Sequence, residues 1–173
     1  KDLFAQCGIQ QYRCIVSAYN KGLSVKDTLR QLEAGELLKI DEVNKLAKES
    51  LNTLKERELA AKVSIPVSDF IEDNFRKVKL FHIHNHPSNI MLSYFLTKLF
   101  EAIGLSSKPV IDGPEMLAHE FPPVLPPVAD GLGLSFSNFD AQVGDYNFTT
   151  EEWIANCFEL YRATPSESGK FAV

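Results

Sequence analysis

Cysteine is scarce in this sequence, which has three in 173 residues: Cys7, Cys14 and Cys157. Because their number is odd and their spacing is not that of a metal site, a disulfide framework is not expected and a reducing compartment is favoured. Long apolar runs are lacking as well, so no segment is expected to span a membrane. No basic stretch followed by an apolar one opens the chain, so no signal peptide is predicted. Together these features predict a cytoplasmic protein.

Positive charge is also in short supply. The chain has 18 Lys and Arg against 23 Asp and Glu, a formal net charge of -5, and a pI near 5.4. Proteins that bind nucleic acid usually carry a basic face, so no nucleic-acid partner is expected. A small anionic ligand remains compatible with this composition, because its site needs only a few local donors.

The length and the apolar content of 45% suit one globular domain with a proper core. We expect residues 1–162 to form this domain and residues 163–173 to be a disordered tail. The chain begins with Lys1 rather than Met, in sequence typical of the middle of a domain. If the chain is a fragment, we expect it to be the C-terminal part of a larger domain.

The pattern of apolar residues predicts an α/β fold that is mainly helical, with a small number of strands. Apolar spacing and capping residues predict helices over residues 1–21, 24–33, 38–62, 68–75, 88–104 and 149–162. The short β-branched and aromatic segment 78–83 predicts a strand buried in a sheet, which Pro87 should end.

The remaining segments give two further expectations. The helix over residues 88–104 has only a narrow polar stripe, so it is expected to be nearly surrounded by protein, in the core. The proline-rich stretch 109–127 predicts a surface loop, followed by a short helical turn near residues 128–132. Residues 135–148 are aromatic and irregular and predict one or two edge strands.

The most distinctive segment is 81–88, Phe-His-Ile-His-Asn-His-Pro-Ser. On a continuous strand, His82, His84 and His86 would lie on one face. The helix that begins after Ser88 offers free backbone N–H groups and its dipole to a phosphate or a developing oxyanion. A nearby imidazole can act as a general base toward a hydroxyl. We therefore predict that the chemistry of this protein is centred on this junction.

Two other interpretations of the histidines stay open. His84-Asn85-His86-Pro87 resembles the His-x-His-Pro core of JAMM metalloproteases, which would make the chain a metal-dependent hydrolase using His84 and His86. That family also needs an Asp on the following helix, and this position holds Leu96 or Thr97. Alternatively, each histidine is a hydrogen-bonded structural residue near a turn.

A series of short motifs runs in order over residues 10 to 162: Arg57-Glu58, Val67-Ser68-Asp69-Phe70-Ile71, Leu80-Phe81, Asn85-His86-Pro87-Ser88, Pro126-Pro127-Val128-Ala129, Leu132-Gly133-Leu134 and Thr150-Glu151-Glu152-Trp153 with Tyr161. This ordered series is similar to that of the WcbI-type acetyltransferases of polysaccharide biosynthesis. The Gly-Asn-Cys-Gln strand and turn that open such proteins are missing from this sequence, and Cys7-Gly8-Ile9-Gln10 is only a loose echo of them. Part of a cofactor pocket would then be missing too.

The resemblance implies that the chain binds coenzyme A or acetyl coenzyme A, without a metal, and transfers an acyl group. The acceptor would be a sugar hydroxyl of a capsular or other surface-polysaccharide precursor. His86 would be the general base, with Asn85 and His84 beside it. Cofactor binding would fall to Ser88 and Asn89, and to Arg57 and Glu58.

The main alternative is a non-catalytic binding or assembly module of a polysaccharide system. Cys14, next to Arg13, is a candidate nucleophile, but a small core residue is the expected role for it and for Cys157. The sequence gives no oligomeric state.

Overall fold

The computed structural model of the chain describes residues 12–136 and 139–163. Within these ranges the chain is mainly helical with few strands, as the sequence predicts. The predicted tail over residues 163–173 lies outside the described residues except for Ala163, which is the last residue of α8. The first half of the predicted helix 1–21 lies outside them as well. Among the described residues, none of the helices is both long enough and apolar enough to cross a membrane.

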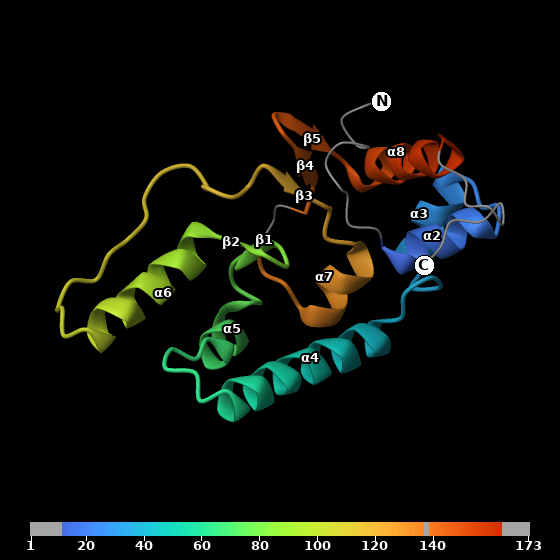
Figure 1. Ribbon diagram of the computed structural model, residues 1–173. Helices are drawn as coiled ribbons and strands as arrows, with labels where there is room; N and C mark the ends of the chain where they lie inside the picture. Colours follow the sequence, from blue (N-terminus) through green and yellow to red (C-terminus); the bar gives the residue numbers. More distant parts are fainter. Residues whose placement is uncertain (1–11, 137–138, 164–173) are drawn as a thin grey trace. The chain divides into compact units, whose positions relative to one another are not determined.

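Figure 1 labels the elements of the chain. The helices are α2 (Arg13–Asn20), α3 (Val25–Glu33), α4 (Ile40–Ala60), α5 (Ser68–Asn74), α6 (Asn89–Ala102), α7 (Pro126–Leu132) and α8 (Thr150–Ala163). The strands are β1 (Phe81–Ile83), β2 (His86–Pro87), β3 (Glu120–Phe121), β4 (Ala141–Val143) and β5 (Tyr146–Phe148).

Contacts divide the chain into two compact units. The described residues of the first unit fall within residues 1–43, 119–131 and 138–173. The second unit consists of residues 44–118 and 132–137. Each unit is therefore built from segments that are far apart in the sequence.

The first unit holds a large hydrophobic core in which α8 packs against α2 and α3 (Figure 1). The largest buried side chain is Trp153, which is 1% exposed, and Tyr19 contacts Phe158 and Tyr161 edge to face. The fully buried members of the core are Ile15, Val16, Ala18, Leu32, Leu125, Ala141, Val143, Trp153, Ile154, Cys157, Phe158 and Tyr161.

Helix ends in the first unit follow the capping signals of the sequence. The Ser24 hydroxyl accepts a hydrogen bond from the Asp27 N–H at 3.0 Å and so begins α3. Thr149 and Glu152 form the predicted capping box before α8: the Glu152 carboxylate accepts from the Thr149 N–H, and the Thr149 hydroxyl accepts from the Glu152 N–H.

The proline-rich region contributes more regular structure to the first unit than its composition suggests. β3 lies within the stretch that was expected to be only a loop, and it pairs antiparallel with β4, which pairs with β5. The one or two edge strands predicted within residues 135–148 are present as β4 and β5, but only β5 lies at an edge, because β4 is between β3 and β5. The helical turn predicted near residues 128–132 is α7.

The second unit contains most of α4, then α5, the β1–β2 pair and α6. The Phe70 and Tyr94 rings stack with their centroids 3.9 Å apart and hold α5 against α6. Leu80 and Met91 are buried in this unit, whereas most of its other apolar side chains are half-buried or exposed.

The predicted buried strand over residues 78–83 is only partly correct. β1 covers three residues, all half-buried, and the chain turns at His84 and Asn85. It returns as β2, in a two-stranded antiparallel sheet in which Ile83 pairs with His86. Pro87 is therefore the last residue of the second strand rather than the residue that ends the first, a position that proline tolerates at a sheet edge.

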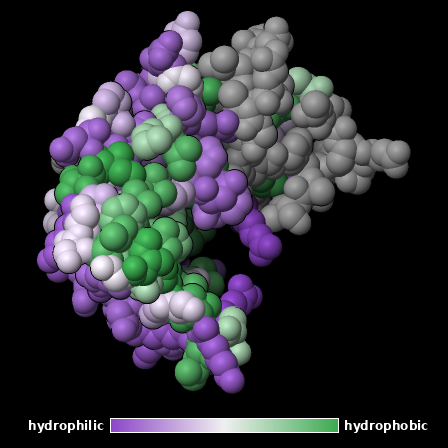
Figure 2. All heavy atoms as spheres, turned by 60° about the vertical axis from the view of Figure 1, so that its left-hand side comes forward, coloured by the Kyte–Doolittle hydropathy of each residue, from purple (hydrophilic) through white to green (hydrophobic). Residues whose placement is uncertain are grey.

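The expectation that the helix over residues 88–104 is surrounded by protein is wrong for the described residues. In α6 only Asn89 and Met91 are buried, because few described elements pack against the rest of the helix. Figure 2 shows apolar side chains gathered at the surface on the side that carries α6. The exposed apolar residues of α6 and the segment after it are Ile90, Phe95, Leu99, Ile103, Leu105, Val110 and Met116.

Candidate functional site

The junction between the β1–β2 pair and α6 brings a histidine and a carboxylate together inside the second unit. The Nε2 atom of His82 lies 3.1 Å from Oε2 of Glu115, and the His82 side chain is only 6% exposed. Glu115 comes from the loop that follows α6 and is 37% exposed. A carboxylate in this position fixes the orientation of the imidazole ring.

The same carboxylate occupies the N-terminus of α6. Oε2 of Glu115 accepts a hydrogen bond from the Asn89 N–H at 2.7 Å. This N–H is one of the free backbone donors that the helix start was expected to offer to a phosphate or an oxyanion. In this arrangement an acidic side chain of the protein itself fills that role.

Ser88 and Asn89 hold the junction together. The Ser88 hydroxyl, 1% exposed, accepts from the Met91 N–H, and the Ser88 N–H donates to the Leu80 carbonyl at 2.9 Å. The Asn89 amide donates to the carbonyls of Gly113 and Pro114, and its oxygen accepts from the Met116 N–H. Both side chains are buried and already satisfied within the protein.

The three histidines do not share the face of one strand, because the strand ends before His84. His84 and Asn85 form the exposed turn between β1 and β2. His86 is half-buried in β2, and among the buried side-chain atoms of the described residues its Nδ1 has no hydrogen-bond partner. His84 and Asn85 on the turn are thus followed directly by His86 at the start of β2, while His82 in β1 is paired with Glu115.

Arg57 and Glu58 lie near the end of α4 and have different roles. The Glu58 carboxylate accepts hydrogen bonds from the Val67 N–H at 2.7 Å and from the N–H and hydroxyl of Ser68, so it caps α5 from a distance. Burial opposes ionisation of Glu58, but these hydrogen bonds outweigh it, and its pKa lies below the usual value. Arg57 is exposed and has no ion-pair partner among the described residues.

Lys79 belongs to this region and was not recognised from the sequence. It precedes β1 and is half-buried, and burial lowers its pKa to about 8, although the nearby Glu115 opposes the shift. Glu115 was not recognised either, because it is far from His82 in the sequence and lies in a stretch read as a plain loop. No local pattern marks either residue.

The cysteines of the described residues are core residues, as expected. Burial raises the pKa of the half-buried Cys14 thiol, and it raises the pKa of the buried Cys157 thiol to about 12. Neither is activated for nucleophilic attack in this state. Over the described parts of the chain, no group of three or more His, Cys, Asp or Glu side chains is placed to hold a metal ion.

Residues 11–108 match the family described as polysaccharide biosynthesis enzyme WcbI. The chain therefore belongs to the WcbI family of polysaccharide biosynthesis enzymes.

One solved structure supports the fold. The chain is similar to a native WcbI described as a novel polysaccharide biosynthesis enzyme, in the form without a disulfide bond between coenzyme A and one of its cysteines. The TM-score is 0.73 at 23% sequence identity, and the match covers 91% of this chain but only 56% of that one. This chain thus spans little more than half the length of that protein. Comparison with curated proteins gave no match.

Proposed function

We propose that this chain carries the acceptor side of a coenzyme A-dependent acyl transfer to a sugar hydroxyl in polysaccharide biosynthesis. The observation that carries the proposal is the junction at α6, where His82 and Glu115 form a fixed pair beside the turn that presents Asn85 and His86. Membership of a family of polysaccharide biosynthesis enzymes supports a sugar acceptor.

In this proposal His86 is the general base. Its Nδ1 is buried, so Nε2 is the nitrogen that a substrate can reach. Nε2 removes the proton of the sugar hydroxyl as the hydroxyl oxygen bonds to the acyl carbon. The imidazolium then returns this proton to the leaving sulfur. Asn85, on the exposed turn, has an amide that can donate a hydrogen bond to the developing oxyanion.

Acetyl coenzyme A, when bound, supplies a thioester whose carbon–sulfur bond breaks as the new ester bond forms. The neutral acyl end suits the junction better than the phosphates do, because Glu115 already fills the N-terminus of α6. Ser88, Asn89 and Glu58 support the site through their hydrogen bonds within the protein. Of the predicted cofactor-binding residues, exposed Arg57 is the one that would bind the phosphates of coenzyme A. His84 lies next to the base on the same turn and would contact the acceptor.

The proposal is tested by two measurements on the whole chain. Calorimetric titration gives the affinity for coenzyme A, and release of free thiol from acetyl coenzyme A in the presence of sugar acceptors gives turnover. His86→Ala should keep its affinity for coenzyme A and lose about a hundredfold or more in turnover, as loss of a general base does. His119→Ala, which removes an exposed histidine outside the junction, is the control and should match the wild type.

Three outcomes count against this proposal. Unchanged turnover in His86→Ala would show that His86 is not the general base. Saturable binding of coenzyme A with no turnover on any acceptor favours the non-catalytic binding module instead. Absence of binding, together with one zinc or iron per purified chain, favours the metal-dependent hydrolase.

A further inference from the structure

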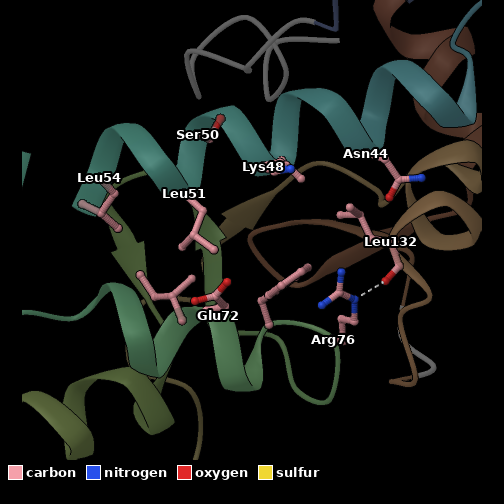
Figure 3. A pocket seen from close by; sticks show the side chains of 11 residues that line it. Asn44, Lys48, Ser50, Leu51, Leu54, Glu72, Arg76 and Leu132 are labelled. Carbon is pink, nitrogen blue, oxygen red and sulfur yellow. Dashed lines mark hydrogen bonds between the residues drawn. The ribbon is translucent and has the colours of Figure 1, made fainter. Parts of the chain in front are cut away.

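A cavity of about 600 Å³ lies between α4 and α5 in the second unit (Figure 3). It shares no lining residue with the junction at α6. Its α4 side is formed by residues at helical spacing, so one face of this helix looks into the cavity. The lining residues are Asn44, Ala47, Lys48, Ser50, Leu51, Leu54, Ile71, Glu72, Phe75, Arg76 and Leu132.

The walls of the cavity are mainly apolar. Leu51 and Leu54 point from α4 toward α5 in Figure 3, and Phe75 and Leu132 also line the cavity. These four side chains are half-buried, so their apolar surface is only partly covered by the described residues. Small-molecule sites have this character: a volume of about 300 to 1,000 Å³, apolar walls and a few placed polar groups.

The charges around the cavity leave an excess of positive charge. Lys55 pairs with two carboxylates: its Nζ lies 2.5 Å from Oε2 of Glu72 and 3.3 Å from Oδ1 of Asp69, so it offsets only one of these two negative charges. Lys48 and Arg76 also line the cavity, and neither has a carboxylate partner among the described residues. The cavity therefore combines apolar walls with two cations that form no ion pair within the described part of the chain, and a smaller positive excess remains after the carboxylates of Glu72 and Asp69 are counted against Lys55.

Arg76 is held in place to present its guanidinium. Its Nε donates to the Leu132 carbonyl at 2.9 Å, and its guanidinium carbon lies 4.4 Å from the centre of the Phe75 ring. Its own carbonyl accepts from the N–H and the hydroxyl of Ser135. Figure 3 shows the two terminal nitrogens of Arg76 directed toward α4. An arginine fixed in this way loses little freedom when it binds an anion.

We propose that this cavity binds a small amphipathic anion, in which an alkyl tail lies against Leu51, Leu54 and Phe75 and a carboxylate or phosphate head contacts Arg76 and Lys48. Charge complementarity selects the head, and the apolar walls select the tail. The inference stands whether or not the chain is an acyltransferase, because it uses none of the residues of the junction.

Calorimetric titration of the whole chain with four eight-carbon probes tests the proposal. Octanoate and octyl phosphate should bind saturably. Octanol should bind about tenfold more weakly, because it lacks the negative charge that forms an ion pair with Arg76. Octylammonium should not bind. Whichever of the two anions binds more tightly identifies the head group.

Variants locate the binding in the cavity. Arg76→Gln should remove the preference for octanoate over octanol, and Leu51→Trp should abolish binding of both by filling the cavity. Ala47→Phe serves the same purpose if Leu51→Trp does not fold, as judged by circular dichroism. Lys45→Gln is the matched control, because Lys45 lies on α4 outside the cavity and pairs with Glu49.

The proposal is overturned if neither anion saturates the protein, or if both bind no better than octanol. It is also overturned if the folded cavity-filling variant binds octanoate as the wild type does.

Discussion

At the scale of the residue, Lys79 is a side chain whose environment departs from what its sequence position suggests. It lies just before β1, half-buried, and burial lowers its pKa to about 8 from the ordinary value of 10.5. Between these two values the unfolded chain holds the Lys79 proton and the folded chain does not. Stability from this residue is therefore lowest below pH 8 and rises as the pH increases toward 10.5.

Lys79→Met should stabilise the protein at pH 7 by about 1 to 2 kcal/mol, a figure reduced from the full pKa shift because Lys79 is partly solvated. The gain should shrink as the pH is raised from 8 to above 10. Urea unfolding of the variant and the wild type over this pH range measures it. Lys77→Met, at an exposed position, should show no such pH dependence. An equal difference at every pH would mean that Lys79 is not perturbed by burial.

At the scale of the element, α5 depends on a carboxylate from another helix. Val67, at the N-cap of α5, has no side-chain cap, and Glu58 of α4 supplies it by accepting from the Val67 and Ser68 N–H groups. Glu58 therefore joins α4 to α5 in a way that neither helix predicts alone, since capping signals in a sequence are normally local.

Glu58→Gln should lower the free energy of unfolding by about 1 kcal/mol at neutral pH, as the loss of a good N-cap does. Because the folded-state pKa of Glu58 is below its usual value, this contribution is present above pH 4.5 and is lost as the pH falls through the folded pKa. Variant and wild type should then converge in acid. The adjacent Arg57→Gln, at an exposed site, should change stability by less than about 0.5 kcal/mol. If both variants behave alike in urea unfolding, Glu58 is not a cap.

The strand and helix around the histidines show which features of secondary structure could be predicted from the sequence and which could not. The capped start of α6 at Ser88 was predicted, because an N-cap serine is a local signal. The turn at His84 and Asn85 was only an alternative to a longer strand, because a continuous strand and a tight strand pair have the same short apolar pattern. The burial of α6 was also misjudged, since an apolar sequence says how a helix could be buried but not which segments cover it.

At the scale of the whole molecule, the first unit draws its core from segments at both ends of the chain. α3 and α8 pack together, and Ile154 of α8 is 0% exposed in the same core as Leu32 of α3. A core shared in this way should open cooperatively.

Ile154→Ala should cost about 2 to 5 kcal/mol of stability. Amide hydrogen exchange should then quicken in α3 as well as in α8, by a similar factor, because the two helices share one core. Glu159→Ala, at an exposed position of α8, is the control and should leave exchange in both helices unchanged. Faster exchange confined to α8 would show that the helices do not open together.

The sequence by itself determined most of the helices, the local caps of α3, α6 and α8, and the position of the junction that holds the candidate site. Ser24, Ser88 and the Thr149–Glu152 box could be recognised because each acts within three residues of its partner. Only the tertiary structure brought Glu115 to His82, 33 positions away, and opened the cavity between α4 and α5. Such pairings depend on how loops close and on which faces pack, and these properties belong to the folded chain as a whole rather than to any local pattern.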